Sequence, residues 1–325
     1  MKLLGLCAKS IALLGLICQV SAGGWAQSYP VKTVKLLVPT SPGSGFDVIG
    51  RIVAGGLSEV FGQQVIVENR VGAAANIGAE AAARAPADGY TLLEISATHV
   101  VNRSLYRNLP YDLVRDFAPV TQLATSPSVV VVHPSLPVKS IGDLVKLAKA
   151  KPGALNYGST GVGSATFLAA ELFKAVADVN LVHVPYRGGG EALTAVVSGE
   201  VPVYFAPFAT AAPQIQHGRL RPLAMTGAAR LSLFPAYPTV AEAGYPGYES
   251  SNWYGIVAPA KTPKDTIATI HAAVVEVLKK PTVSKRLSDL GYIIVGDQPE
   301  QFAAHIKSEI EKLGKILRDL RVPTE

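Results

Sequence analysis

Two loops rich in glycine and hydroxyl side chains carry the groups of this sequence that are best suited to hold a ligand. The first runs from Pro39 to Gly45 and the second from Gly158 to Ser164. Glycine lets backbone N–H groups approach a ligand, and a helix start adds unsatisfied donors and a partial positive charge. Hydroxyl donors come from Ser41, Ser44, Ser159, Thr160 and Ser164. Because a carboxylate needs several converging donors, the loops predict a carboxylate site that needs no arginine.

Each loop lies between a predicted strand and a predicted helix. Strand Val34–Val38 precedes the first loop, and helix Phe46–Phe61 follows it. Strand Leu155–Tyr157 precedes the second loop, and helix Ser164–Ala177 follows it. Ligands of open α/β sheets bind at the carboxyl ends of strands. The repeated arrangement therefore predicts one site that is closed from two sides.

Helix capping is the structural alternative for the same residues. Ser44 and Asp47 have the spacing of a capping box, in which the two residues bond each other's backbone. The same pattern at Ser140 and Asp143 has no glycine-rich loop before it and reads as purely structural. A bare carboxylate beside an anionic ligand would repel it. Capping is therefore favoured for Asp47, which stays among the candidate ligand contacts because of its place in the loop.

Arg187 lies in a third strand-to-helix loop, which runs from Val184 to Gly190. Its guanidinium could bind a ligand carboxylate with two parallel hydrogen bonds. It could equally be a solvated surface arginine. Both interpretations stay open at this point.

Enzyme motifs are missing from the sequence. It has no G-x-S-x-G elbow, no phosphate-binding P-loop and no complete dinucleotide fingerprint. The histidines stand far apart without metal-ligand spacing, at His99, His133, His183, His217, His271 and His305. We therefore expect no catalytic residue, no metal and no cofactor. A hydrolase that uses Ser164 with a distant histidine is the weaker alternative.

Short apolar runs alternate with helical patterns along the rest of the chain, which is typical of an α/β fold with parallel sheets. Predicted strands are Thr33–Val38, Val65–Glu68, Thr91–Ile95, Val129–His133, Leu155–Tyr157, Leu181–Val184, Val201–Phe205, Leu220–Met225 and Tyr254–Ala258. Further helices are predicted at Asn76–Ala85, Ser140–Ala150, Glu191–Ser198, Pro263–Leu278 and Pro299–Leu320.

The N-terminus reads as a secretory signal peptide, residues 1–26. Lys2 and Lys9 precede or flank a short apolar run, and small residues lead to a cleavage site after Ala26. Both cysteines, Cys7 and Cys18, lie within it. A lipid anchor at Cys18 would need a small residue where Ile17 stands. We therefore expect a soluble, cysteine-free periplasmic chain.

Length and charge narrow the class of protein further. About 300 residues after cleavage exceed what one core usually holds, which favours two lobes. The full chain of 325 residues has 30 basic and 24 acidic residues, and the loss of Lys2 and Lys9 leaves a charge of +4. The basic residues form no run, so nucleic acid is not expected as a partner.

Motifs along nearly the whole chain give it a family resemblance. The matching stretches are Tyr29-Pro30, Pro42-Gly43 to Asp47 with Arg51, Val67 to Arg70, Asn76 to Ala79, Pro86 to Thr91, Tyr111-Asp112, Asp116 to Val120, Asn156-Tyr157, Glu171 to Phe173, His183 to Tyr186, Pro238 to Gly244 and Ala258-Pro259. In this order and spacing the chain resembles the periplasmic substrate-binding receptors of tripartite tricarboxylate transporters, the Bug family.

The resemblance implies a type II periplasmic binding protein fold, α/β with two lobes, two parallel-rich sheets and a central ligand cleft. By this model lobe 1 comprises residues 27–124 plus 226–325, and lobe 2 comprises residues 125–225. The two glycine-rich loops would bind a small organic carboxylate, without a cofactor. The monomeric receptor would then deliver it to the membrane permease of the transporter. A sensory module that docks a signalling protein is the alternative.

Three departures from the family pattern bear on the ligand. Phe46 stands where family members mostly have a small or polar residue, and Phe167 stands where many have a histidine. Ala206 replaces an aspartate that is common in the family, with Phe208 after it. An apolar, aromatic cleft would suit an aromatic mono- or dicarboxylate such as terephthalate. Alternatively, Phe46 and Phe167 turn inward and only pack. The candidate ligand contacts are Ser41, Gly43, Ser44, Gly45, Phe46, Asp47, Ser159, Thr160, Gly163, Ser164, Phe167, Arg187 and Phe208.

Overall fold

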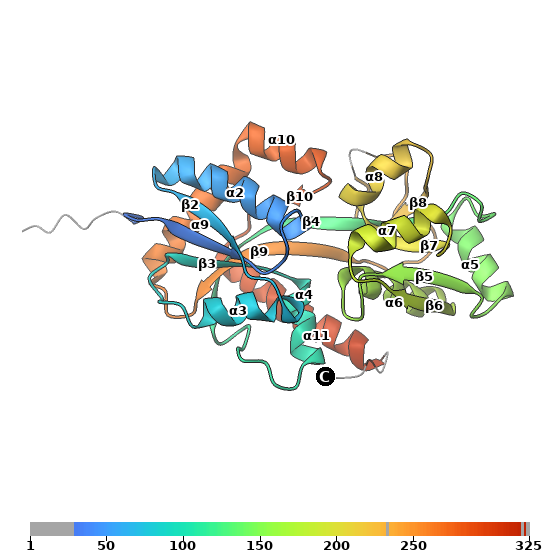
Figure 1. Ribbon diagram of the computed structural model, residues 1–325, viewed down its shortest axis with the longest axis horizontal. Coiled ribbons are helices and arrows are strands. Elements are labelled where there is room, and N and C mark those ends of the chain that lie inside the picture. The colour runs from blue at the N-terminus through green and yellow to red at the C-terminus, as the bar shows by residue number, and fades with distance from the viewer. Residues whose placement is uncertain (1–28, 232–233, 320–321, 323–325) are drawn as a thin grey trace, which may run out of the picture.

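The computed structural model describes residues 29–231, 234–319 and 322 (Figure 1). The predicted signal peptide lies outside these residues. Within them, no helix combines the length and apolar character that crossing a bilayer requires. The strands run in one hydrogen-bonded order, β2-β1-β3-β9-β4-β7-β5-β6, with β8 and β10 paired to β4 beside this path.

One group of strands, the A part, carries the first loop. It contains β1 (Val34–Val38), β2 (Val65–Asn69), β3 (Thr91–Ser96), β9 (Ser251–Pro259), β10 (Ile293–Ile294) and residues 117–127 of β4 (Phe117–Val132). Its helices are α2 (Gly45–Phe61), α3 (Asn76–Ala83), α4 (Ala97–Leu105), α9 (Lys264–Lys279), α10 (Pro281–Asp289) and α11 (Pro299–Asp319), with a short 3₁₀ turn η1 (Ala73–Ala75). Apolar residues of β1 and α2, among them Leu36, Ile49 and Val53, are buried together in one core.

The other group, the B part, carries the second loop. It contains β5 (Leu155–Ser159), β6 (Leu181–Pro185), β7 (Val203–Pro207), β8 (Arg221–Met225) and residues 128–132 of β4. Its helices are α5 (Ile141–Ala150), α6 (Ala165–Ala177), α7 (Gly189–Ser198) and α8 (Phe208–Gln216). Figure 1 shows the two parts side by side, with β4 and the chain that enters β9 crossing from one to the other.

Both parts contain a parallel and an antiparallel region. β1 pairs in parallel with β2 and β3, and β5 pairs in parallel with β6 and β7. All pairings of β4 and β9 are antiparallel. The predicted α/β fold is confirmed, and its sheets are mixed because the long strands that join the parts run against their neighbours.

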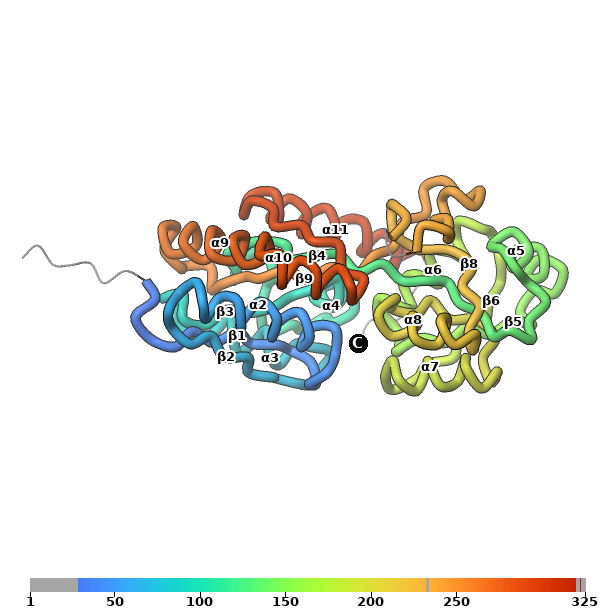
Figure 2. Tube along the Cα trace, turned by 90° about the horizontal axis from the view of Figure 1, so that it is seen from above, coloured from blue at the N-terminus to red at the C-terminus, as the bar shows by residue number. Residues whose placement is uncertain are grey.

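β4 changes partners where the A part meets the B part. Up to Pro127 it pairs with β9, and from Ser128 it pairs with β7 and β8. Figure 2 shows β4 and the chain leading into β9 as connections between the two parts. The sequence predicted this strand from Val129 onward, and the structure begins it at Phe117. Buried polar residues such as Thr121 and Gln122 interrupt the apolar pattern in its first half.

Candidate functional site

The two glycine-rich loops fold alike. Gly43 and Gly163 both take the left-handed conformation, with φ of +79° and +78°, which glycine adopts without steric cost. The next residue in each loop is the serine that caps the following helix. The Ser44 hydroxyl accepts a hydrogen bond from the Asp47 amide at 3.3 Å, and the Ser164 hydroxyl accepts one from the Phe167 amide at 3.2 Å. The repeat seen in the sequence is therefore a repeat of backbone geometry.

Each cap leaves other amide groups of its helix free to bind a ligand. The first amides of a helix have no partner inside it, and the serines satisfy only the third one. The amides of Gly45 and Phe46 begin α2, and those of Ala165 and Thr166 begin α6. Both helix starts thus offer N–H donors and a partial positive charge, as a carboxylate requires.

Asp47 supports the first loop from below. Its carboxylate accepts hydrogen bonds from the Gly43 amide at 2.9 Å and from Asn69 at 2.9 Å, and Arg51 binds both of its oxygens. Burial alone would raise the pKa of Asp47, but these hydrogen bonds outweigh it and hold the pKa below its ordinary value. Capping by Ser44 is confirmed, while the carboxylate bonds Gly43 rather than the Ser44 amide. The negative charge is neutralised by Arg51 and is buried.

Ser159 lies beneath the second loop. Its side chain is 0% exposed, and its hydroxyl oxygen is 2.6 Å from His183 Nε2 and accepts the Gly161 amide at 3.0 Å. Next to it, the amide of Thr160 donates to the Thr166 hydroxyl at 3.0 Å. Sequence reasoning missed His183, because a residue 24 positions away on the next strand gives no spacing signal.

Ser164 has no histidine partner in the structure. Its hydroxyl donates to the Gly161 carbonyl at 2.7 Å and lies 3.1 Å from the Thr166 hydroxyl. The described residues also contain no cluster of three or more histidine, cysteine or acidic side chains that could hold a metal ion. The Ser164 arrangement therefore gives no support to the hydrolase alternative.

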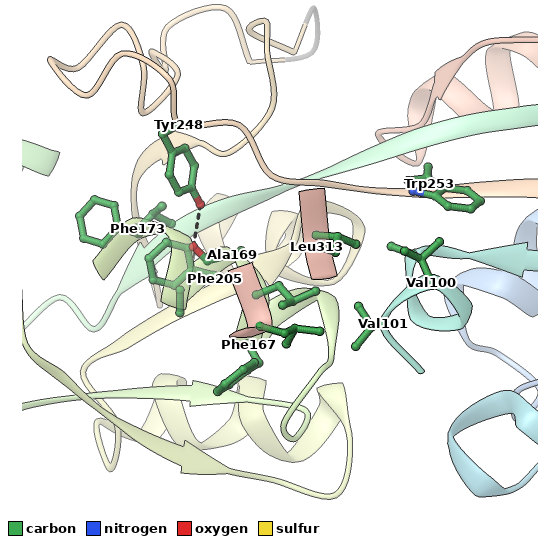
Figure 3. Packing of buried hydrophobic residues seen from close by; sticks show 14 of the residues in the cluster. Val100, Val101, Phe167, Ala169, Phe173, Phe205, Tyr248, Trp253 and Leu313 are labelled. Carbon is green, nitrogen blue, oxygen red and sulfur yellow. Dashed lines mark hydrogen bonds between the residues drawn. The ribbon is translucent and has the colours of Figure 1, made fainter. Parts of the chain in front are cut away.

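The three phenylalanines pack against protein groups. Phe46, Phe167 and Phe208 are 7%, 6% and 2% exposed. Phe46 contacts the Tyr254 ring edge-on at 5.1 Å, and Phe167 contacts the His183 ring at 4.9 Å. Figure 3 shows Phe167 in one buried cluster with Val101 of α4. The inward-packing alternative describes all three rings in this structure.

The two parts touch beside the loops. A β-carbon placed on Gly163 would lie 2.5 Å from Leu105 Cδ1 and 3.0 Å from Val101 Cγ1. Phe208 lies against Gly291 of the A part and packs on Phe234 at 5.0 Å between ring centroids. The second loop thus rests on α4, and the start of α8 rests on the end of α10.

Buried ionisable groups below the first loop form a second set that sequence reasoning missed. Glu94 on β3 is 0% exposed, and neither carboxyl oxygen has a hydrogen-bond partner. Burial raises its pKa well above the ordinary value, with a smaller contribution from Asp47. Burial also lowers the pKa of His99 to about 4. Tyr292 donates to the Gly45 carbonyl at 3.0 Å and so joins this set to the start of α2. In the sequence, this set is indicated only by Glu94, a single acidic residue within an apolar strand.

The remaining candidates lie nearer the surface. Ser41 and Gly43 are exposed, and Ser44 and Gly45 are half-buried. The Arg187 side chain is exposed, and its backbone amide donates to Glu191 at 3.2 Å. Each group therefore lies where solvent reaches it, and the ligand contacts assigned to these residues stay predictions.

Known proteins match this architecture over nearly its full length. The family model "Tripartite tricarboxylate transporter family receptor" matches residues 49–322. BugT of Bordetella pertussis is 33% identical over 320 residues, 98% of this chain and 97% of its own. The R. palustris protein Rpa4515 with adipate is 34% identical with a TM-score of 0.81, over 89% of this chain and 97% of its own. MatC from Rhodopseudomonas palustris with bound malate is 29% identical with a TM-score of 0.78, over 89% and 100%. The chain therefore belongs to the tripartite tricarboxylate transporter family of receptors, which includes the Bug proteins, and has their periplasmic binding protein fold.

Proposed function

We propose that this chain is a periplasmic receptor that captures a small organic carboxylate between its two loops and delivers it to the permease of a tripartite tricarboxylate transporter. The observation that carries the proposal is the pair of capped helix starts with the same backbone geometry, one in each part. Each helix start offers uncapped amides, and the carboxylate of Asp47 in the first turn of α2 is buried against Arg51. Two separated donor groups suit a ligand with an anionic group at each end.

A linear dicarboxylate is the first candidate ligand. Relatives of the chain were found with adipate and with malate, both of which are aliphatic dicarboxylates. The aromatic ligand predicted from Phe46, Phe167 and Phe208, terephthalate, requires rings that face the ligand. Because all three rings already have partners within the protein, terephthalate becomes the second candidate.

Closure of the two parts would complete the site. We assign residues 27–124 plus 226–325 to one lobe and residues 125–225 to the other, with the change of partners in β4 at the join. The contacts of Gly163 with α4 and of Phe208 with Gly291 would then form when the lobes close on the ligand. Ser159, whose hydroxyl lies 2.6 Å from His183 Nε2, is 0% exposed, and we propose that the receptor releases its ligand unchanged.

Titration calorimetry of the exported protein with adipate, malate, terephthalate and citrate tests the proposal. We expect a dicarboxylate to bind at one site and to be recovered unchanged after long incubation. The double variant Ser44→Ala, Ser164→Ala removes both caps and should weaken binding roughly tenfold, which corresponds to about 1.4 kcal/mol. Ser140→Ala is the matched control, because Ser140 caps α5 in the same way away from the loops. Equal affinities for the double variant and the control would contradict the proposal, as would conversion of the ligand.

A further inference from the structure

We propose that His183 is a positioning residue that sets the shape of the second loop and couples carboxylate capture to the uptake of a proton. The inference rests on the proposed function and concerns the same site. It begins with a hydrogen bond of 2.6 Å between Ser159 Oγ and His183 Nε2.

The imidazole of His183 is held on two sides. His183 lies on β6 directly beside Tyr157 of β5, and the two rings stack at 5.1 Å with an interplanar angle of 27°. Phe167, on the first turn of α6, contacts the ring edge-on at 4.9 Å. Between these contacts, Nε2 of the ring points at Ser159 of the loop.

The hydroxyl of Ser159 has two settings, and the proton on His183 Nε2 selects between them; in this proposal neutral His183 carries its proton on Nδ1. The Ser159 oxygen accepts the Gly161 amide at 3.0 Å in both. When Nε2 is unprotonated, the hydroxyl donates to it. When Nε2 carries a proton, the imidazole donates to the hydroxyl oxygen, and the hydroxyl proton turns to the Gly161 carbonyl, 3.3 Å away. In both settings the hydroxyl proton stays inside the protein, so Ser159 shapes the loop rather than donating to the ligand.

Gly161 connects the Ser159 hydroxyl to the end of the loop that we propose binds the ligand. Its carbonyl accepts the Ser164 amide at 3.2 Å and the Ser164 hydroxyl at 2.7 Å. Ser164 is the cap of α6 and precedes the free amides of Ala165 and Thr166. A chain of hydrogen bonds thus runs from His183 through Ser159 and Gly161 to the cap.

Burial, together with the charges around the ring, favours the neutral form of His183 in the absence of ligand. Burial lowers its pKa, the nearby Glu171 carboxylate raises it and Lys174 lowers it further, with a net shift below the ordinary value. Glu171 is already bound by Tyr157 at 2.5 Å and by Lys174 at 2.6 Å. A ligand carboxylate at the start of α6 would add an unpaired negative charge close to the ring, and such a charge favours the protonated form.

Linkage then fixes the direction of the pH effect. A ligand that raises the pKa of His183 must bind more tightly as the pH falls through the range between the free and the bound pKa. Because the free value lies below the ordinary value of about 6.5, the affinity should rise as the pH falls from neutral toward that free value. At higher pH, His183 is neutral in both states and the affinity should level off.

Calorimetry of the full mature protein with adipate and with terephthalate, in buffers of different ionisation enthalpy from pH 6 to pH 8, tests the inference. We expect proton uptake on binding that grows as the pH falls from 8 to 6, and an affinity higher at pH 6 than at pH 8; one proton allows at most about tenfold per pH unit. His183→Gln keeps a hydrogen-bonding group near the Nε2 position without titrating. It should lose both the proton uptake and the rise in affinity toward low pH, whatever its affinity at pH 8.

A second histidine–serine pair provides the control. His133 Nδ1 lies 2.7 Å from the Ser135 hydroxyl, outside both loops, so His133→Gln should retain the wild-type pH dependence. The ligand's own titration is common to all variants and cancels. Proton uptake that persists in His183→Gln would overturn the inference. A wild type that binds no carboxylate at any pH would instead overturn the proposed function.

Histidine NMR of the wild type gives a reading that does not depend on a folded variant. The His183 ring can be identified by its proximity to the Tyr157 ring. Its pKa should rise when adipate or terephthalate, whichever binds, is added. An unchanged pKa at saturating ligand would overturn the inference as well.

Discussion

Ser128 of β4 and Thr226, the residue after β8, are hydrogen-bonded to each other where the chain passes between the two parts. The Ser128 amide donates to the Thr226 hydroxyl at 2.8 Å, and that hydroxyl donates back to the Ser128 carbonyl at 3.0 Å. The Thr226 amide also donates to the Ser128 carbonyl, and the Thr226 carbonyl accepts the Ser250 amide at 2.8 Å. We expect a movement of one part against the other to pivot close to this pair.

Replacement of the Thr226 hydroxyl should destabilise the fold. Thr226→Val keeps the shape but leaves the buried Ser128 amide without its partner, which costs about 1–3 kcal/mol of unfolding free energy. Thr262→Val is the matched control, because the Thr262 hydroxyl is buried without a partner; its loss should be neutral or stabilising. Urea denaturation of both variants makes the measurement, and equal losses would show that the Ser128 contact contributes nothing.

Glu94 should make the fold less stable as the pH rises. Its pKa is raised in the folded state from 4.5, so its contribution is fully present below that value and is lost as the pH climbs toward the folded pKa. Glu94→Gln should therefore be more stable than the wild type at pH 8 and nearly equal to it at pH 4.5. The exposed Glu276→Gln provides the control for denaturation at both values. A Glu94→Gln protein that is destabilised at pH 8 would contradict this account.

Asp47 should make the fold more stable as the pH rises, which is opposite to the effect of Glu94. Its folded pKa is lowered from 3.8, so its contribution is present above that value and is lost as the pH falls through the folded pKa. Asp47→Asn should lose about 1–3 kcal/mol at pH 7, because the charge-assisted hydrogen bonds with Arg51 and Gly43 weaken. Asp143→Asn, which alters an exposed cap contact to Lys139, should lose much less. Thermal or urea unfolding measures both variants. Similar losses of unfolding free energy would show that Asp47 contributes no special stabilisation to the first loop.

A methyl group on Gly163 should disturb the contact between the two parts. Gly43 and Gly163 share the same φ, but a β-carbon at Gly43 would meet nothing within 4 Å, whereas one at Gly163 would meet Leu105. Gly43→Ala therefore measures backbone strain alone, about 1–2 kcal/mol. Gly163→Ala should cost more and should enlarge the radius of gyration in X-ray scattering. Identical behaviour of the two variants would show that the loop does not bear on α4.

Most of the fold could be predicted from the sequence because the hydrophobic periodicity and the glycine-rich loops indicate the same boundaries between strands and helices. All nine predicted strands and all seven predicted helices have counterparts among the described residues. Helices α4, α8 and α10 and the two-residue strand β10 were missed, and α10 buries little besides Leu287 and so shows little apolar periodicity. α4 is capped by Ser96 and His99, with histidine where the usual signal is an acid, and α8 has Pro213 inside it.

The site could be predicted only to the level of its loops. Glycine and serine spacing placed Gly43, Ser44, Gly163 and Ser164 correctly at two helix starts. Residue type alone does not say which way a side chain turns, so an aromatic cleft was as consistent with the sequence as a packed core. The partner of Ser159, His183, comes from the neighbouring strand, and only the strand register brings the two together.

A crystal structure of the wild-type protein with the dicarboxylate that binds best tests the central claim most directly. The account predicts one carboxylate within hydrogen-bond distance of the Gly45 and Phe46 amides and the other within hydrogen-bond distance of the Ala165 and Thr166 amides. A ligand that touches only one of the two loops, or lies away from both, would contradict it.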